Sequence, residues 1–125
     1  MNDQSVAVVY ARSATDNRDG IRDQILACRE YAQSRRRMII GEFVDLCVSG
    51  NSLDNRPGLN EALTVLRTGQ VLLLADIDRL ARDYSVLKTA IRKVHARGAC
   101  VAAANGSEKF IPFRSFRGNG FRKTV

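Results

Sequence analysis

Short apolar runs along the chain alternate with segments in which apolar residues recur at helical spacing. A short apolar run that does not alternate with polar residues is typical of a strand buried on both faces of a parallel sheet. Such runs predict four strands, at residues 5–9, 37–44, 71–75 and 99–104. Each of the first three ends in polar residues, which indicates that these strands deliver side chains to one edge of the sheet.

The segments between the runs predict three helices. Apolar spacing places the first from about Ile21 to Ser34, a second that ends near Gly69, and a third that ends at Gly98. An alternation of strands and helices implies right-handed crossovers and a mostly parallel sheet. We therefore predict a three-layer α/β fold, with helices on both faces of the sheet.

The length of 125 residues and the hydrophobic fraction of 45% fit one domain. We place this domain at residues 5–106. The segment 107–125 is basic, holds four of the five phenylalanines and is interrupted by Pro and Gly. Aromatic and basic residues together can follow a nucleic-acid strand, but we expect a disordered tail instead.

Ligands of open α/β sheets bind in the crevice outside the carboxyl ends of the strands. We expect residues 10–16 to form a loop at that edge, behind the first strand. The long polar loop at residues 47–58 and the segment 76–83 follow the next two strands. Together, these strand ends supply the candidate site residues Arg12, Arg56, Arg79, Arg82, Asp45, Ser49 and Asp78.

The net charge of +7 rests on sixteen arginines and four lysines. Arginine binds phosphate in a planar, bidentate manner, so this balance favours a polyanionic partner. The triplet at residues 35–37 closes the first helix, and we interpret it as a capping cluster rather than a DNA contact. The lone His95 lies on the third helix, where we expect no catalytic role.

The three cysteines, Cys28, Cys47 and Cys100, are widely spaced and form no CxxC pair. This pattern argues against a disulfide framework or a zinc site and predicts reduced thiols in the cytoplasm. No apolar run approaches the roughly 20 residues of a membrane span. We expect no membrane association.

Four arginines at one crevice suit a phosphoryl centre, where guanidinium groups stabilise charge on the phosphate oxygens. The chain has neither a P-loop nor a GxGxxG motif. A hydroxyl nucleophile remains, with Ser13, Thr15 and Ser49 as candidates. Asp76 and Asp78 could bind Mg²⁺, but the neighbouring arginines compete as charge partners, so we expect no metal and no cofactor.

Four motifs in unbroken order resemble the catalytic domain of serine recombinases, the family of resolvases, invertases and large serine integrases. The similarity spans about residues 5–106, and the linked motifs make it specific. They are YARxxTD at residues 10–16, DQ with CREYA within residues 23–32, VSGNSLDNRPGL at residues 48–59, and DRLARD at residues 78–83.

The resemblance implies site-specific DNA cleavage and rejoining through a 5′-phosphoserine link, without metal or cofactor. It implies that four arginines bind the scissile phosphate. Asp78 would assist leaving-group protonation or arginine placement. Gln24, Asp45 and Ser49 would support the site. The arginines are Arg12, Arg56, Arg79 and Arg82.

The chain departs from the family at the nucleophile, which lies two residues after the motif arginine. That position holds Ala14, which has no hydroxyl. The adjacent Ser13 faces the opposite side of an extended segment. We therefore expect a cleavage-deficient domain, either a knockout or a decayed copy. The alternative is a non-catalytic, DNA-associated protein that regulates active recombinases by joining their assemblies.

Family members continue into a long helix and a separate DNA-binding domain, whereas this sequence ends at Val125 in a segment that resembles neither. We expect DNA as the partner, bound weakly, non-specifically and in a salt-sensitive manner. A full-length form would be a dimer or tetramer, and the chain as given a monomer. The DNA site and the direction of recombination are not encoded in these motifs.

Overall fold

All four strands of the sheet run parallel, in the order β2-β1-β3-β4. The computed structural model describes residues 5–110. β1 lies at the centre and pairs with β2 on one side and β3 on the other. The strands are β1 (Val6–Ser13), β2 (Met38–Leu46), β3 (Val71–Leu74) and β4 (Cys100–Ala103).

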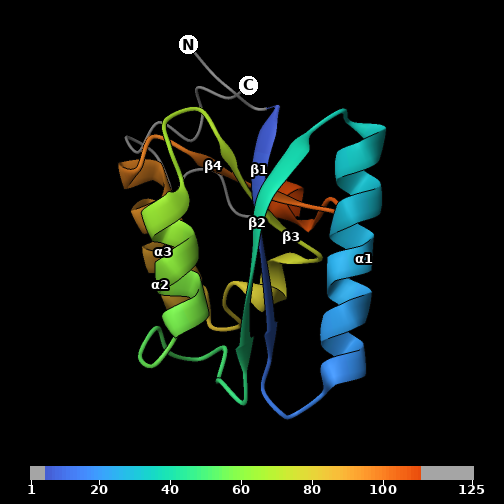
Figure 1. The fold of residues 1–125 in the computed structure, drawn as a ribbon. Coiled ribbons are helices and arrows are strands. Elements are labelled where there is room, and N and C mark those ends of the chain that lie inside the picture. Colours follow the sequence, from blue (N-terminus) through green and yellow to red (C-terminus); the bar gives the residue numbers. More distant parts are fainter. Residues whose placement is uncertain (1–4, 111–125) are drawn as a thin grey trace.

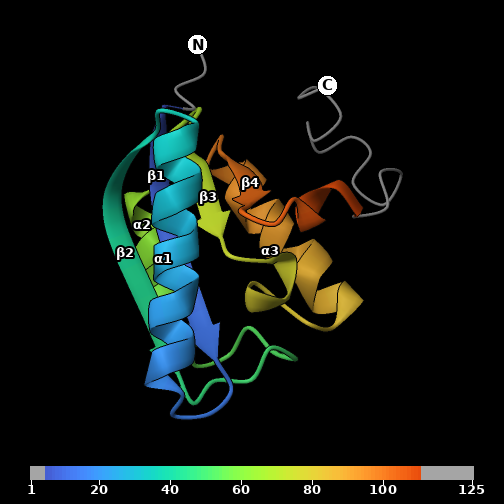
Figure 2. The same ribbon diagram turned by 90° about the vertical axis from the view of Figure 1, so that its right-hand side faces the viewer.

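Helices cover both faces of this sheet. α1 packs alone on one face, and α2 and α3 share the other (Figures 1 and 2). This arrangement confirms the predicted three-layer α/β fold. The helical elements are α1 (Arg18–Ser34), α2 (Pro57–Val65), α3 (Tyr84–Ala96) and the 3₁₀ turns η1 (Ile77–Arg79) and η2 (Ser107–Phe110).

Each helix starts where a polar side chain satisfies its free backbone N–H groups. The Asn17 side chain accepts from the Gly20 N–H at the start of α1, and Asp83 accepts from two N–H groups of α3. α2 begins with Pro57, and its first N–H groups are bound by a carboxylate from β2. It ends at Val65, before the predicted Gly69, because Leu66 is extended.

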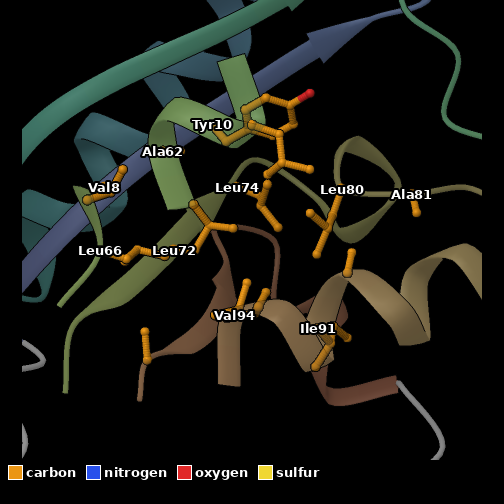
Figure 3. Packing of buried hydrophobic residues seen from close by; sticks show 14 of the residues in the cluster. Val8, Tyr10, Ala62, Leu66, Leu72, Leu74, Leu80, Ala81, Ile91 and Val94 are labelled. Carbon is orange, nitrogen blue, oxygen red and sulfur yellow. The ribbon is translucent and has the colours of Figure 1, made fainter. Parts of the chain in front are cut away.

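The core consists of two clusters, one on each face of the sheet. Ala7 and Val9 of β1 point toward α1, while Val8 and Tyr10 point toward α2 and α3. Figure 3 shows the second and larger cluster, into which the helices insert leucine, isoleucine and valine side chains. The alternation along β1 confirms that this strand is buried on both faces.

Two predicted strand ends are wrong, because the strands continue into polar residues. β1 extends through Ser13, so residues 10–13 are not part of a loop. β2 extends to Leu46 and therefore contains Asp45. The ladder explains both differences, since Arg12 pairs with Asp45 and Ser13 with Leu46.

The described structure continues past residue 106 into η2. η2 is joined to the domain because the Ser107 hydroxyl accepts a hydrogen bond from the Ile77 N–H at 2.8 Å. The Glu108 carboxylate accepts another from the Ala103 N–H at 2.9 Å. The boundary at residue 106 and the tail stay predictions, and residues 111–125 lie outside the described part of the chain. Within residues 5–110 no helix is long and apolar enough to cross a membrane.

Candidate active site

A cavity of about 420 Å³ opens at the carboxyl end of the sheet. Residues from the ends of β1, β3 and β4 meet there, as the strand-end rule predicts. Three of its lining residues are arginines and two are aspartates, so the cavity is polar and charged. It is lined by Arg12, Ala14, Asp76, Ile77, Asp78, Arg79, Arg82, Asn105 and Ser107.

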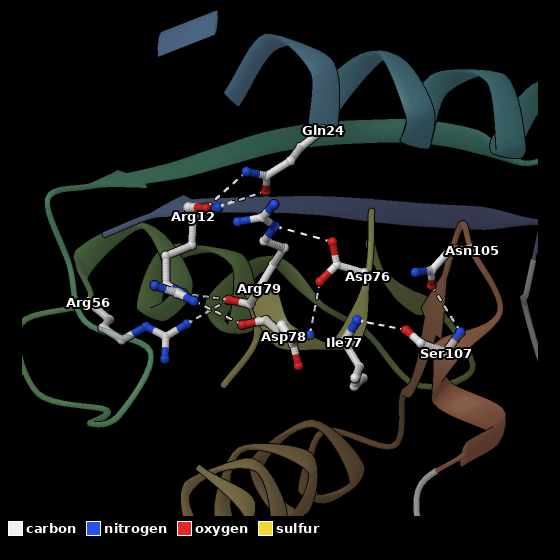
Figure 4. A network of polar contacts seen from close by, with 9 residues as sticks. All are labelled: Arg12, Gln24, Arg56, Asp76, Ile77, Asp78, Arg79, Asn105 and Ser107. Atoms are coloured by element: carbon white, nitrogen blue, oxygen red, sulfur yellow. Dashed lines mark hydrogen bonds and ion pairs between the residues drawn. The ribbon is translucent and has the colours of Figure 1, made fainter. Parts of the chain in front are cut away.

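Arg12 is held rigidly although it reaches the cavity. The Gln24 side chain binds the Arg12 backbone twice, accepting from its N–H at 3.1 Å and donating to its carbonyl at 2.9 Å. The Arg12 guanidinium donates to the carbonyls of Arg79 and Asp78 at 3.0 and 2.9 Å (Figure 4). It also donates to the Val48 carbonyl at 2.9 Å. Burial and the nearby Arg56 cation lower the pKa of Arg12. Arg12 thus connects the loops around the cavity to the central strand through hydrogen bonds.

Arg79 and Arg82 are the more accessible cations of the cavity. The Arg79 Nε donates to Asp76 at 3.2 Å, and Asp76 in turn accepts from the Asp78 N–H, which fixes η1 (Figure 4). Arg82 is exposed, and its backbone N–H donates to the Gly50 carbonyl at 2.9 Å. No hydrogen bond or ion pair holds the Arg82 guanidinium within the described residues. An anion in the cavity would meet two guanidinium groups with free donors.

Gly50 allows this close approach of the loop to the arginines. A Cβ atom at Gly50 would lie 2.5 Å from Arg12 Nη2 and 2.8 Å from Arg82 Cγ. Any larger residue would therefore displace both side chains.

Arg56 lies behind the cavity rather than in it. It is 1% exposed. Its guanidinium donates to the Tyr10 hydroxyl at 3.0 and 3.2 Å and to the carbonyls of Ser52 and Arg79. The Tyr10 hydroxyl donates to Asp45 at 2.7 Å, and burial raises the pKa of Tyr10.

Asp45, Ser49 and Arg56 therefore do not line the cavity, although the sequence analysis had placed them in the same site as the other arginines. Asp45 is buried and accepts from the N–H groups of Gly58 and Leu59 at the start of α2. Ser49 is exposed on its loop, where its hydroxyl accepts from the Asn51 N–H at 3.0 Å. The reason is the edge position of β2, two strands away from β3.

The predicted nucleophile position does face the cavity. Ala14 is exposed and lines it, whereas Ser13 is 6% exposed and does not. The Ser13 hydroxyl accepts from the Thr15 N–H at 3.2 Å. The methyl group of Ala14 thus stands where the arginines converge, and the neighbouring hydroxyl points elsewhere.

The sequence analysis missed three cavity residues: Ile77, Asn105 and Ser107. Asn105 and Ser107 follow β4, so applying the strand-end rule to the fourth strand would have found them. The Asn105 side chain accepts from the Ser107 N–H at 3.0 Å, and Ser107 holds η1 through the Ile77 N–H (Figure 4). No three side chains of His, Cys, Asp or Glu come together within residues 5–110.

The family described as "Resolvase, N terminal domain" matches residues 7–120 of the chain. No curated protein sequence matches it. Several solved structures share the fold. The N-terminal catalytic domain of TP901-1 integrase aligns with a TM-score of 0.74 and 18% identity, over 95% of this chain and 97% of that one.

A resolvase family site-specific recombinase from Streptococcus pneumoniae gives a TM-score of 0.71 at 20% identity, over 95% of this chain and 89% of that one. The C-terminal catalytic domain of ISC1926 TnpA, an IS607-like serine recombinase, gives 0.67 at 22% identity, over 78% and 68%. At these identities the structural matches establish the fold.

Proposed function

The chain belongs to the resolvase N-terminal domain family, and from this premise we propose that its cavity binds a phosphodiester of DNA. The observation that carries the proposal is the convergence of Arg12, Arg79 and Arg82 on one cavity. Guanidinium groups bind phosphate oxygens in pairs and stabilise the charge that develops when phosphorus is attacked. The roles of the three differ.

Arg79 and Arg82 would contact the phosphate, because their donors are largely unused. Arg12 would orient them, because its own donors bind backbone carbonyls, among them that of Arg79. Arg56 would act from behind, since it also binds the Arg79 carbonyl, at 3.2 Å. Asp78 is exposed at the rim, where it would assist protonation of the leaving oxygen or placement of an arginine.

We further propose that the domain does not cleave DNA as it stands. In a competent recombinase the serine oxygen attacks phosphorus, and the released 3′ oxygen takes up a proton. Ala14 offers no oxygen for this bond, and Ser13 faces away from the cavity. The fold and the arginines would then support binding without chemistry.

Ala14 also favours a second candidate function, that of a non-catalytic partner. A domain that keeps the recombinase fold could enter assemblies of active recombinases and block one of their sites. The two functions differ in the effect of Ala14→Ser. Restored cleavage would support a silenced catalytic domain, and absence of cleavage with DNA binding intact would support the regulatory partner.

The binding proposal is tested by fluorescence anisotropy with a 20-base-pair duplex at several salt concentrations. The double variant Arg79→Gln and Arg82→Gln should bind several-fold more weakly at low salt. The slope of log K against log salt should also become shallower by roughly 2. The charge-matched control is Arg29→Gln with Arg92→Gln, on the exposed faces of α1 and α3. Equal affinities for the two double variants would contradict the proposal.

A further inference from the structure

The loops that lead into β2, β3 and β4 carry arginines and no acidic residue. Acidic residues are absent from residues 31–41, 62–75 and 84–104. In a parallel sheet these loops lie at the amino ends of the strands (Figure 1). The cavity opens at the opposite, carboxyl end. We call this surface the basic edge, and it consists of Arg35, Arg36, Arg37, Arg67 and Arg97.

The three loops lie at the same end of the sheet. The Gly69 N–H donates to the Gly98 carbonyl at 2.8 Å, which joins the loops before β3 and β4. Tyr31, near the end of α1, and Cys100, at the start of β4, pack against the same smaller core cluster. Four of the five arginines are exposed and Arg37 is half-buried. None of the five forms an ion pair within residues 5–110.

Two of these arginines have a structural role. The Arg97 guanidinium donates to the carbonyls of Thr64 and Leu66 at the end of α2, and Arg67 donates to that of Thr64. Such contacts satisfy free carbonyls at a helix C-terminus. These contacts explain the presence of Arg67 and Arg97 by themselves, so neither residue is evidence for a binding partner.

The triplet at residues 35–37 has no such role, although the sequence had suggested capping. The last carbonyls of α1 are bound by the backbone N–H groups of the triplet itself, and the Ser34 hydroxyl donates to the Tyr31 carbonyl. The guanidinium of Arg35 lies 4.6 Å from the centre of the Tyr31 ring, and that of Arg37 lies 5.7 Å away. Arg36 is exposed with a φ of 55°. Arg35 and Arg36 are thus exposed without carbonyl partners, whereas Arg37 is half-buried and its buried Nη1 has no hydrogen-bond partner within residues 5–110.

We propose that the basic edge is a second contact for the phosphate backbone of DNA, separate from the cavity. The 17 residues of α1 separate the two sites by roughly 25 Å. Planar guanidinium groups without competing carboxylates suit phosphates, and such contacts position a duplex without reading its sequence. An acidic protein surface is the competing partner.

The test measures duplex binding by the double variant Arg35→Gln and Arg36→Gln, against the control Arg29→Gln with Arg92→Gln. We expect the edge variant to bind several-fold more weakly at low salt, with a salt slope shallower by roughly 2. Thermal unfolding verifies that both variants fold, and Arg36→Gln alone, expected to lower the slope by roughly 1, replaces the double variant if it does not.

The same pair of substitutions is then made in the Arg79→Gln and Arg82→Gln background. An equal further loss of affinity there would support an edge that binds independently of the cavity. An edge variant that matches the control would overturn the proposal, as would binding of polyglutamate in place of the duplex. Failure of the cavity proposal would give a different result, since only the cavity substitutions would then leave the duplex affinity unchanged.

Discussion

The hydroxyl of Tyr10 connects two buried charged groups, and its removal by Tyr10→Phe should be costly. It donates to Asp45 at 2.7 Å and accepts from two nitrogens of Arg56 at 3.0 and 3.2 Å. Tyr10 is 0% exposed, so no water can replace the lost partner without a rearrangement. A hydrogen bond to a charged group contributes about 1.5–3 kcal/mol, so we expect a loss of about 3 kcal/mol.

Unfolding entropy scales with chain length, at about 2.1 cal/mol/K per residue. For 125 residues, a loss of about 3 kcal/mol should lower the Tm by roughly 12 °C. Thermal and urea unfolding, followed by circular dichroism, measure this change. The control is Tyr84→Phe, because Tyr84 is 42% exposed and should tolerate the loss of its hydroxyl. A Tyr10→Phe variant as stable as the control would refute the assigned network.

Three further substitutions test other parts of the account. Gly58→Ala should destabilise the fold by about 2 kcal/mol in urea unfolding, because its Cβ would lie 2.6 Å from the Val44 carbonyl oxygen. Gly50→Ala should lower the free energy of duplex binding by more than it lowers the free energy of unfolding, since its Cβ would displace Arg12 and Arg82. Burial raises the pKa of Cys28 to about 12. The contribution of the neutral Cys28 thiol to stability is therefore complete below pH 9 and is lost as the pH rises toward 12. Between pH 9 and 11, the unfolding free energy of Cys28→Ala should fall less steeply than that of the unmodified chain, by about 1.4 kcal/mol per pH unit.

The positions of the strands and the burial of both their faces could be predicted from the sequence. A short apolar run favours a buried strand without information about distant parts of the chain. β1 and β3 are buried on both faces, and their residues are apolar at almost every position. The same reasoning ended β1 too early, because its last residues are polar. Arg12 and Ser13 remain in the strand through pairing with β2, which is a contact between distant parts of the chain.

The candidate site was predictable where it depends on the sheet edge alone. Arg12, Asp78, Arg79 and Arg82 line the cavity as expected. The burial of Arg56 was not predictable, because it depends on the Tyr10 hydroxyl and on carbonyls of two separate loops. A guanidinium that finds enough internal acceptors can leave the surface, and the spacing of residues does not reveal such acceptors.

The most direct test of the account is to restore the missing hydroxyl with Ala14→Ser. The variant domain is placed before the dimerisation helix and DNA-binding domain of an active serine recombinase, and incubated with that recombinase's DNA site. Denaturing gels and mass spectrometry then detect a covalent link between protein and DNA. The account predicts a 5′-phosphoserine adduct at residue 14 with Ala14→Ser and none with the unmodified domain. An adduct formed by the unmodified domain, or none from a variant that binds the site, would contradict it.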